Sequence, residues 1–498
     1  MATGKALDGK PYAGNPHVRF DEGEVAPATT PRRGSLLYRD VIGRRDFLGF
    51  LSASVGGAMV CQAGAFTDGE HPALKVGILS DIHLSDEARR KSKAYIAIFE
   101  NTLRFYRDNG VDAVIIAGDL TNEGWMSEMH VVVEAWKHAF EGGPEPVRVI
   151  VTGNHERDFF LKAKADGKLD AAACAGALYN DIRANWRQLF GEEWTPFFIR
   201  RVKGYAFIGA HWGENLDGNA LRAFLDSHRA ELAGPKPFFF VQHAHPKDTC
   251  YGPTAWDQKN GGATSEVLAD YPNAVAFSGH THYSLVDERS VWQGAFTSVG
   301  TAALRCVYLP DGRENSGAKT RMAWMRGGSQ GMLMEVYPRR LRLSRYELTK
   351  MKKIGEDWVV PVPASPAAPA FAFAARASSA NAPQFPAGAA IDVISRQGKS
   401  PNGVDEEQLT VEFTAAAGSG DSLSRVFDYE VRIEGESGVT CVKRVYQPGV
   451  LGPLPDRLEA ASCVFGICEL PPSLRRIIVT PFNSLGVKGR PLVWSGKV

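Results

Sequence analysis

Several features are scarce or missing in this sequence, and each absence excludes a class of protein. Cysteine is rare, with 7 residues in 498, and no two cysteines form a C-x-x-C pair, so a zinc knuckle is not expected. Lysine plus arginine (57) nearly balance aspartate plus glutamate (56), which leaves a formal net charge of +1. Nucleic-acid-binding proteins normally carry a strongly basic domain or stripe, so no nucleic-acid partner is expected.

Long hydrophobic runs are missing as well. After the amino-terminal region, no segment is both long and apolar enough to cross a membrane, so the mature protein is expected to have no transmembrane segment. The overall composition of the chain, with 44% hydrophobic and 23% charged residues, is typical of a globular protein that buries a core. The length suggests about two to four domains.

The amino terminus has the pattern of an export signal. Residues 1–35 are polar and aperiodic, and we expect them to be disordered. Residues 36–65 contain two adjacent arginines, a mildly apolar run with glycines, and then A-G-A where a signal peptidase needs small residues. This segment resembles a twin-arginine signal, carried by Arg44, Arg45, Phe47 and Leu48. The protein is therefore predicted to be exported, to the periplasm or the extracellular space.

Two alternatives to this interpretation stay open. Cys61 could be a lipid-anchor site, although Val60 before it is bulkier than a lipoprotein signal normally allows. An ordinary amphipathic helix that follows an arginine pair is the other alternative.

Residues 73–350 alternate buried strands with helical patterns. Strands are expected at 74–80, 113–117 and 147–151, and helices at 88–108 and 126–140. This order predicts a sheet with helices packed against it and right-handed crossovers. Further helices are expected within 161–190 and 220–233, and further strands at 205–210, 238–242, 274–278, 331–337 and 340–347.

The composition changes after these elements. Residues 351–389 are rich in proline and alanine and are predicted to form a linker or an irregular strap. Residues 390–498 show only short alternating segments, which predicts an all-β sandwich. The L-P-P before its last long strand and the P-F-N-S-L-G-V-K-G that ends it resemble a fibronectin type III domain. Cys463 and Cys468 lie close enough to be bridged if a turn separates them.

Two histidines one residue apart, His280 and His282, follow the apolar run at 274–278. Residues i and i+2 point to the same side of a strand, so both imidazoles can aim at one point beyond its end. A metal ion, or a pair of ions, is the target that this arrangement suggests. An H-x-H pair alone is weak evidence.

Polar side chains of the same kind follow the other predicted strands. In chain order the motifs are S-D-I-H-L, A-G-D-L-T-N-E-G, T-G-N-H-E, H-A-H-P and G-H-T-H. Ligands gather at the carboxyl ends of strands in sheets flanked by helices, so we expect these groups to meet. The glycines at 118, 153 and 279 let the backbone turn and approach the site. The candidate residues are Asp81, His83, Asp119, Asn122, Asn154, His155, Glu156, His243, His245, His280 and His282.

The donor types indicate which ions are expected. Carboxylate, imidazole and amide groups without cysteine favour zinc, manganese or iron over calcium. Two such ions about 3.5–4 Å apart can hold the attacking and leaving oxygens of a phosphoryl displacement. The expected cofactors are therefore two divalent or trivalent metal ions (Mn, Fe or Zn), with one carboxylate as a natural bridge between them.

The ordered set D-x-H, G-D, G-N-H-[DE], a single His and G-H-x-H resembles the calcineurin-like metallophosphoesterase superfamily, over residues 73–346. The resemblance implies an α/β fold with four layers, α/β/β/α, in which two mixed sheets pack face to face. It also implies seven metal ligands: Asp81, His83 and His282 for one ion, Asn154, His243 and His280 for the other, and Asp119 for both. His155 is implied to protonate the leaving oxygen or to stabilise the transition state, and Asn122 to hydrogen-bond the substrate.

The function implied by this resemblance is hydrolysis of a small phosphomonoester or phosphodiester, by in-line attack of a hydroxide held between the two ions. His245 competes with His243 for the ligand position, and His243 is favoured because it is nearer the strand end. Glu156 is expected to hydrogen-bond behind the ligands rather than bind metal. The alternative function is a non-catalytic metal-binding scaffold or adhesion protein that uses the β-sandwich, and the complete ligand set favours the enzyme.

Overall fold

The computed structural model describes residues 70–85, 92–158, 180–213, 217–257, 260–310, 323–324, 328–400, 402–418, 421–436, 438, 440–453 and 460–496. The predicted amino-terminal extension (1–35) and export signal (36–65) lie outside the described residues. Within the described ranges, no helix has the length and apolar character needed to cross a membrane.

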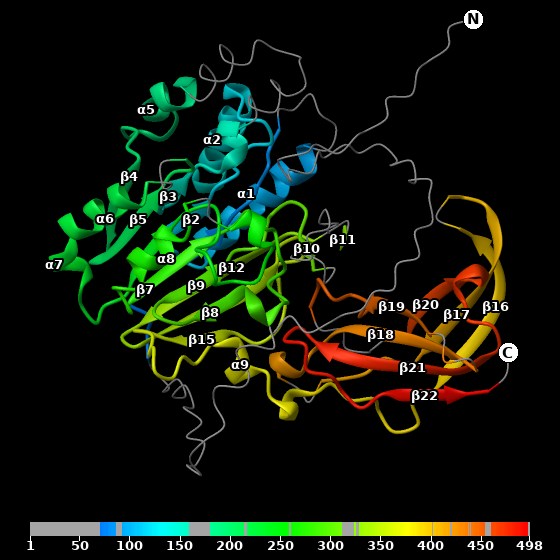
Figure 1. The fold of residues 1–498 in the computed structure, drawn as a ribbon. Helices are drawn as coiled ribbons and strands as arrows, with labels where there is room; N and C mark the ends of the chain where they lie inside the picture. The colour runs from blue at the N-terminus through cyan, green and yellow to red at the C-terminus, as the bar shows by residue number, and fades with distance from the viewer. Residues whose placement is uncertain are drawn as a thin grey trace, which may run out of the picture.

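The first sheet combines strands from the beginning and the end of the α/β region, residues 74–361 (Figure 1). Its strand order is β14-β13-β12-β1-β2-β3, and β15 also pairs with β13. The strands are β1 (Leu74–Leu79), β2 (Ala113–Ala117), β3 (Val147–Val151), β12 (Gln330–Tyr337), β13 (Arg340–Glu347), β14 (Lys352–Lys353) and β15 (Trp358–Pro361). Strands β1, β2 and β3 are parallel, and β12 is antiparallel to β1. Helices α1 (Ser92–Asp108) and α2 (Met126–Phe140) cover the outer face.

The second sheet has the order β4-β5-β6-β7-β9-β8. Its strands are β4 (Phe197–Val202), β5 (Tyr205–Ala210), β6 (Phe238–Val241), β7 (Ala274–Ser278), β8 (Val291–Gln293) and β9 (Thr297–Gly300). The four strands β5, β6, β7 and β9 are parallel. Helices α6 (Gly218–Ser227), α7 (Arg229–Leu232) and α8 (Ala263–Leu268) pack on its outer face.

The two sheets face each other across one hydrophobic cluster. Ile78 and Ile115 of the first sheet and Phe239 and Phe277 of the second belong to it, and all four are fully buried. Burial of each such side chain stabilises the fold by about 1.5–3 kcal/mol relative to its exposure. Separate clusters join each sheet to its helices. The predicted α/β/β/α architecture of two mixed sheets is therefore confirmed.

Some elements differ from the predictions. The pattern at 220–233 forms two helices, α6 and α7, separated at His228. Within the pattern at 161–190, residues 161–179 lie outside the described ranges, and α5 covers Trp186–Phe190. The segment 352–361, expected as part of a linker, pairs with β13 as β14 and β15. Trp358 and Val360 are buried in the core, and four residues, W-V-V-P, are too few to show an alternating pattern in the sequence.

Residues 390–498 contain the predicted all-β sandwich (Figure 1). One sheet has the order β16-β17-β20 and the other β19-β18-β21-β22. The strands are β16 (Ile391–Lys399), β17 (Asp405–Phe413), β18 (Val426–Gly435), β19 (Thr440–Tyr446), β20 (Ala461–Gly466), β21 (Leu474–Asn483) and β22 (Leu492–Ser495). Val411 of one sheet and Val431 of the other belong to the same core cluster. Cys463 is buried, Cys468 is exposed, and neither forms a disulfide.

His211, at the end of β5, is a structural histidine. It is 1% exposed, its Nδ1 accepts a hydrogen bond from the Thr152 N–H at 3.1 Å, and Trp194 stacks on its ring at 3.9 Å. Burial, together with the positive charges of Arg183 and Arg200, lowers the pKa of His211 to about 3. The imidazole is therefore neutral in the folded protein at every pH above that value.

The buried His211 predicts a loss of stability in acid. An unfolded histidine has a pKa of about 6.5, so between that value and about 3 the unfolded chain binds one more proton at this position. Stability therefore falls by about 1.4 kcal/mol per pH unit as the pH decreases through this window. His211→Asn keeps an acceptor for Thr152 and removes the titration. Denaturation of both proteins between pH 7 and 4 should show the variant losing less stability, and parallel curves would contradict the assignment.

Candidate metal centre

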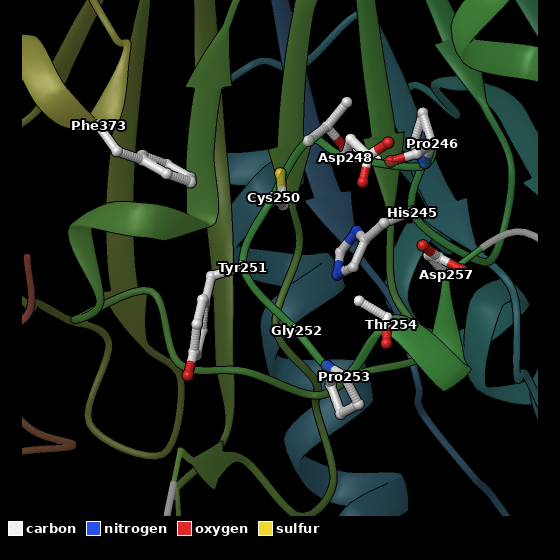
Figure 2. A pocket seen from close by; sticks show the side chains of 11 residues that line it. His245, Pro246, Asp248, Cys250, Tyr251, Gly252, Pro253, Thr254, Asp257 and Phe373 are labelled. Carbon is white, nitrogen blue, oxygen red and sulfur yellow. Dashed lines mark hydrogen bonds between the residues drawn. The ribbon is translucent and has the colours of Figure 1, made fainter. Parts of the chain in front are cut away.

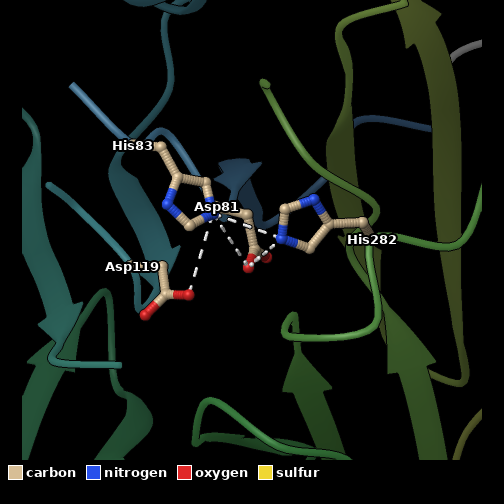
Figure 3. Close-up of side chains that lie close together, drawn as sticks. All are labelled: Asp81, His83, Asp119 and His282. Atoms are coloured by element: carbon tan, nitrogen blue, oxygen red, sulfur yellow. Dashed lines mark hydrogen bonds and ion pairs between the residues drawn. The ribbon is translucent and has the colours of Figure 1, made fainter. Parts of the chain in front are cut away.

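The predicted site residues meet at one edge of the molecule, where the carboxyl ends of β1, β2, β3, β6 and β7 lie together. In Figure 3, Asp81, His83, Asp119 and His282 turn their polar atoms toward one another. Their ligand atoms all lie within 4.8 Å of one another, and all four residues are buried. His282 Nε2 is 3.0 Å from Asp81 Oδ1. His83 Nε2 is 3.2 Å from His282 Nε2 and 3.7 Å from Asp119 Oδ2.

A second group shares Asp119 with the first. The ligand atoms of Asp119, His243 and His280 also lie within 4.8 Å of one another. His243 Nε2 is 3.1 Å from Asp119 Oδ2 and 3.0 Å from Asn154 Oδ1. The seven predicted ligands therefore form two adjacent groups with one carboxylate in common.

Backbone carbonyls set the orientation of two of the imidazoles. His243 Nδ1 donates to the carbonyl of Ala117 at 2.7 Å, and His282 Nδ1 donates to the carbonyl of Cys306 at 2.9 Å. A carbonyl oxygen can only accept, so the proton is on Nδ1 and the Nε2 lone pair faces the site. Hydrogen bonds of this kind are typical of metal-binding histidines.

The backbone at the site is in an unusual conformation. Five of the seven residues have positive φ angles, between 47° and 67°: Asp81, His83, Asp119, His280 and His282. This left-handed region costs a non-glycine residue roughly 1–2 kcal/mol, and such strain tends to collect at functional sites. Neighbouring glycines leave the room that the ligands need, because a Cβ on Gly279 would lie 2.2 Å from Asp81 Oδ2. A Cβ on Gly153 would lie 2.0 Å from Asp119 Oδ1.

His155 lies beside the two groups and is more accessible than they are. Its side chain is 19% exposed, while that of Asp119 is 2% exposed. Its N–H donates to Asp119 Oδ1 at 2.9 Å, and its Nδ1 donates to the backbone carbonyl of Asn122 at 2.6 Å. The orienting group for His155 is thus the main chain of Asn122. From the sequence, only the Asn122 side chain was expected to have a role. The contact between His155 and the Asn122 main-chain carbonyl was missed, because every residue type has such a carbonyl.

The other two candidates, His245 and Glu156, hydrogen-bond to residues around the ligand groups. His245 is not in either group, because its Nδ1 contacts Ser278 Oγ at 2.5 Å and its Nε2 contacts Thr281 Oγ1 at 2.8 Å. Glu156 accepts hydrogen bonds from the Thr121 N–H and hydroxyl and from the Gly153 N–H. Burial and the nearby charge of Asp119 raise the pKa of Glu156 to about 7. Glu156 therefore ties together the turns that carry Asp119 and Asn154.

The electrostatics of Asp119 fit a site for cations. Burial opposes ionisation of this carboxyl group, but the imidazoles of His243, His155 and His83 outweigh it and hold its pKa well below the ordinary value. The described residues thus offer an ionised carboxylate, imidazole nitrogens and an amide oxygen in one buried volume. This is a donor set for two ions of the zinc, manganese or iron type.

A cavity of about 310 Å³ lies next to the metal centre. Figure 2 shows residues of the loop after β6 around it, with the His245 ring among them and Phe373 of α9 (Phe373–Arg376) on the far side. The same loop carries Trp256, whose ring lies 5.5 Å from that of His280. Two aromatic residues of this loop pack against other parts of the protein. Trp256 is 6% exposed, and the Tyr251 ring stacks on Tyr283 and contacts the Arg289 guanidinium.

The part of the chain that carries the site matches a known protein family. The Calcineurin-like phosphoesterase family model matches residues 74–284. These residues form a calcineurin-like phosphoesterase domain, which confirms the predicted enzyme class, a hydrolase of phosphoric esters, and supports a dinuclear metal site. A comparison with curated proteins found no match.

Several solved structures are similar to part of the chain. A dimetal phosphatase from Danio rerio has 11% identity and a TM-score of 0.37, over 58% of this chain and 99% of its own. A purple acid phosphatase from yellow lupin seeds has 12% identity and a TM-score of 0.38, over 58% of this chain and 55% of its own. Vps29 from Entamoeba histolytica has 10% identity and a TM-score of 0.27, over 57% of this chain and 99% of its own.

Proposed function

We propose that this protein is a dinuclear metal-dependent phosphoesterase that hydrolyses small phosphomonoesters or phosphodiesters. The observation that carries the proposal is the pair of buried ligand groups with Asp119 in common. Asp81, His83 and His282 would hold one ion. Asn154, His243 and His280 would hold the other, and Asp119 is common to both groups. When bound, the ions would stabilise charge on the phosphoryl oxygens and would lower the pKa of a water molecule.

His155 supplies the proton that the departing alcohol needs. As an oxygen from water forms a bond to phosphorus, the P–O bond to the leaving group breaks, and the leaving oxygen takes the proton from His155 Nε2. The proton on Nδ1 stays in place, because it is held by the Asn122 carbonyl at 2.6 Å. The imidazole is left neutral and regains its Nε2 proton from solvent, which its exposed edge reaches. The Asn122 side-chain amide hydrogen-bonds the substrate.

We also propose that the protein is exported and that residues 390–498 are a fibronectin type III-like domain. The twin-arginine pattern at 36–65 supports export. The strand orders β16-β17-β20 and β19-β18-β21-β22 support the domain type, because a sandwich of three plus four strands is expected for it. Replacing Arg44 and Arg45 together with lysine should leave unprocessed protein inside the cell, and normal processing of that variant would contradict export.

Metal analysis and a substrate panel test the proposed activity. The purified protein is stripped of metal, reloaded with Mn²⁺, Zn²⁺ or Fe, and assayed against p-nitrophenyl phosphate, bis-p-nitrophenyl phosphate, cyclic nucleotides and glycerophosphodiesters. We expect two ions per chain and turnover of at least one substrate class. Two bound ions without turnover would favour the scaffold alternative. A protein that binds no transition metal would contradict both functions.

A further inference from the structure

The segment from Thr301 to Pro310, which follows β9, lies directly against one half of the metal centre. Its first part is bonded to the turn after β1. The Leu304 N–H donates to the Ser80 carbonyl at 3.0 Å, and the Arg305 N–H donates to the Asp81 carbonyl at 3.1 Å. The Arg305 side chain is 8% exposed and donates to the His83 carbonyl at 2.9 Å. The 301–310 segment therefore fixes the backbone of both Asp81 and His83.

The second part of the 301–310 segment holds His282. The Cys306 carbonyl accepts from His282 Nδ1 at 2.9 Å, and the Tyr308 N–H donates to the His282 carbonyl at 2.8 Å. The Tyr308 ring stacks on the imidazole, with centroids 4.9 Å apart and planes 14° apart. Ala302 and Cys306 have φ angles of 56° and 64°. A non-glycine residue keeps this conformation only where its surroundings enforce it.

The C-terminal sandwich holds the 301–310 segment from the other side. The Tyr446 hydroxyl, at the end of β19, donates to the Pro310 carbonyl. The Gln330 side chain donates to the Leu451 carbonyl at 2.9 Å, while the Gln330 N–H donates to the Ala303 carbonyl at 2.9 Å. Leu451, just after β19, belongs to the same buried cluster as Val307 and Leu309. Figure 1 shows β19 on the side of the sandwich that faces β10 (Tyr308–Leu309).

We propose that the sandwich is part of the support of the metal centre, and that Leu451 and Tyr446 are positioning residues for one of the two ions. They hold the 301–310 segment, which in turn fixes Asp81, His83 and His282. This inference rests on the proposed function, because it takes these three residues as the ligands of one ion. Groups that orient metal ligands typically alter metal affinity 10–100-fold when removed. If the 301–310 segment shifts, the ligands should shift with it, because a close-packed protein interior has few voids that could absorb the movement.

A matched pair of leucine variants tests the proposal. Leu451→Ala removes a buried side chain at the contact with the 301–310 segment. Leu409→Ala removes a buried side chain from β17, inside the sandwich core and away from that contact. Both variants are expected to destabilise the fold. Metal is titrated into each metal-free protein and followed by calorimetry and by elemental analysis. We expect L451A to bind one ion as the wild type does and the other roughly 10-fold more weakly or worse, and L409A to bind both ions normally.

A second variant keeps the test decisive if L451A does not fold. Tyr446→Phe removes only the hydroxyl that contacts Pro310, and should weaken the same single ion by a smaller factor. His282→Ala identifies the ion concerned, because it removes one of the four proposed ligands of that ion, Asp81, His83, Asp119 and His282. Equal affinities in L451A and L409A, or in Y446F and the wild type when L451A is not folded, would overturn the proposal. A wild type that binds fewer than two ions would instead contradict the proposed function, so the two failures are distinguishable.

Discussion

Replacing Asp119 with asparagine is expected to abolish turnover and to release metal from both positions. Asp119 is the residue common to the two ligand groups, and its carboxylate lies 3.1 Å from His243 Nε2 and 3.7 Å from His83 Nε2. Asparagine keeps the size of the side chain but removes the charge that attracts both cations. Loss of several kcal/mol of transition-state stabilisation corresponds to about a 10³-fold decrease in kcat/KM or more. Steady-state kinetics and elemental analysis measure both effects.

Asp112→Asn is the matched control for this variant. Asp112 precedes the same strand, β2, at its opposite end, where it accepts from the Lys75 N–H at 2.9 Å and pairs with Lys203. It carries the same charge as Asp119 and lies away from both ligand groups. Its variant should keep two ions and near-normal activity. An Asp119→Asn protein that retains both ions and more than a tenth of its activity would contradict the bridging role.

Replacing Glu288 with glutamine is expected to destabilise the fold strongly without removing a metal ligand. Glu288 is 1% exposed and accepts from Arg345 Nη1 at 2.8 Å, from Trp358 Nε1 at 2.8 Å and from Arg376 Nη2. Both arginines are also buried, so the variant leaves two guanidinium groups without a counter-charge. Removing one partner of a buried ion pair typically costs about 3–5 kcal/mol. Chemical denaturation measures the loss.

An exposed ion pair provides the comparison for Glu288. Glu231 contacts Arg201 at 2.8 Å, but both side chains are more than a third exposed, and pairs of this kind contribute about 0–1 kcal/mol. Glu231→Gln should therefore leave stability nearly unchanged. Similar losses of stability in the two variants would contradict the role of Glu288 as the buried partner of Arg345 and Arg376. The folded E288Q protein should still bind two ions, because none of the proposed ligands is altered.

The metal centre was largely predictable because of where its residues stand along the chain. Each motif follows an apolar run, and parallel strands bring their carboxyl ends to one edge of a sheet. The order of the runs was therefore enough to expect that Asp81, Asp119 and His280 meet. The choice between His243 and His245 was open in the sequence. The structure puts His243 in the cluster because the hydroxyls of Ser278 and Thr281 occupy both nitrogens of His245.

Several strands were missed, including β4, and two of the short ones are β9 and β15. The four residues of β9, T-S-V-G, have too few positions to show a period, and the four of β15, W-V-V-P, stand directly before a segment rich in proline and alanine. Because β9 was missed, the 301–310 segment after it had no predicted place at the site. The residue types of this segment, T-A-A-L-R-C-V-Y-L-P, do not indicate that its backbone carbonyls and amides hydrogen-bond to Asp81 and His282.

The amino-acid sequence by itself determined the fold class, the division into an α/β part and an all-β part, and which side chains are candidates for binding metal. It could do so because hydrophobic periodicity and residue chemistry are local properties of a chain. Only the tertiary structure decided which groups orient those ligands and what holds the two halves together. Cys306 acts on His282 through a main-chain carbonyl, and Tyr446 reaches Pro310 across 136 positions. Contacts of this kind depend on strand register and on the packing of distant segments, which local patterns do not encode.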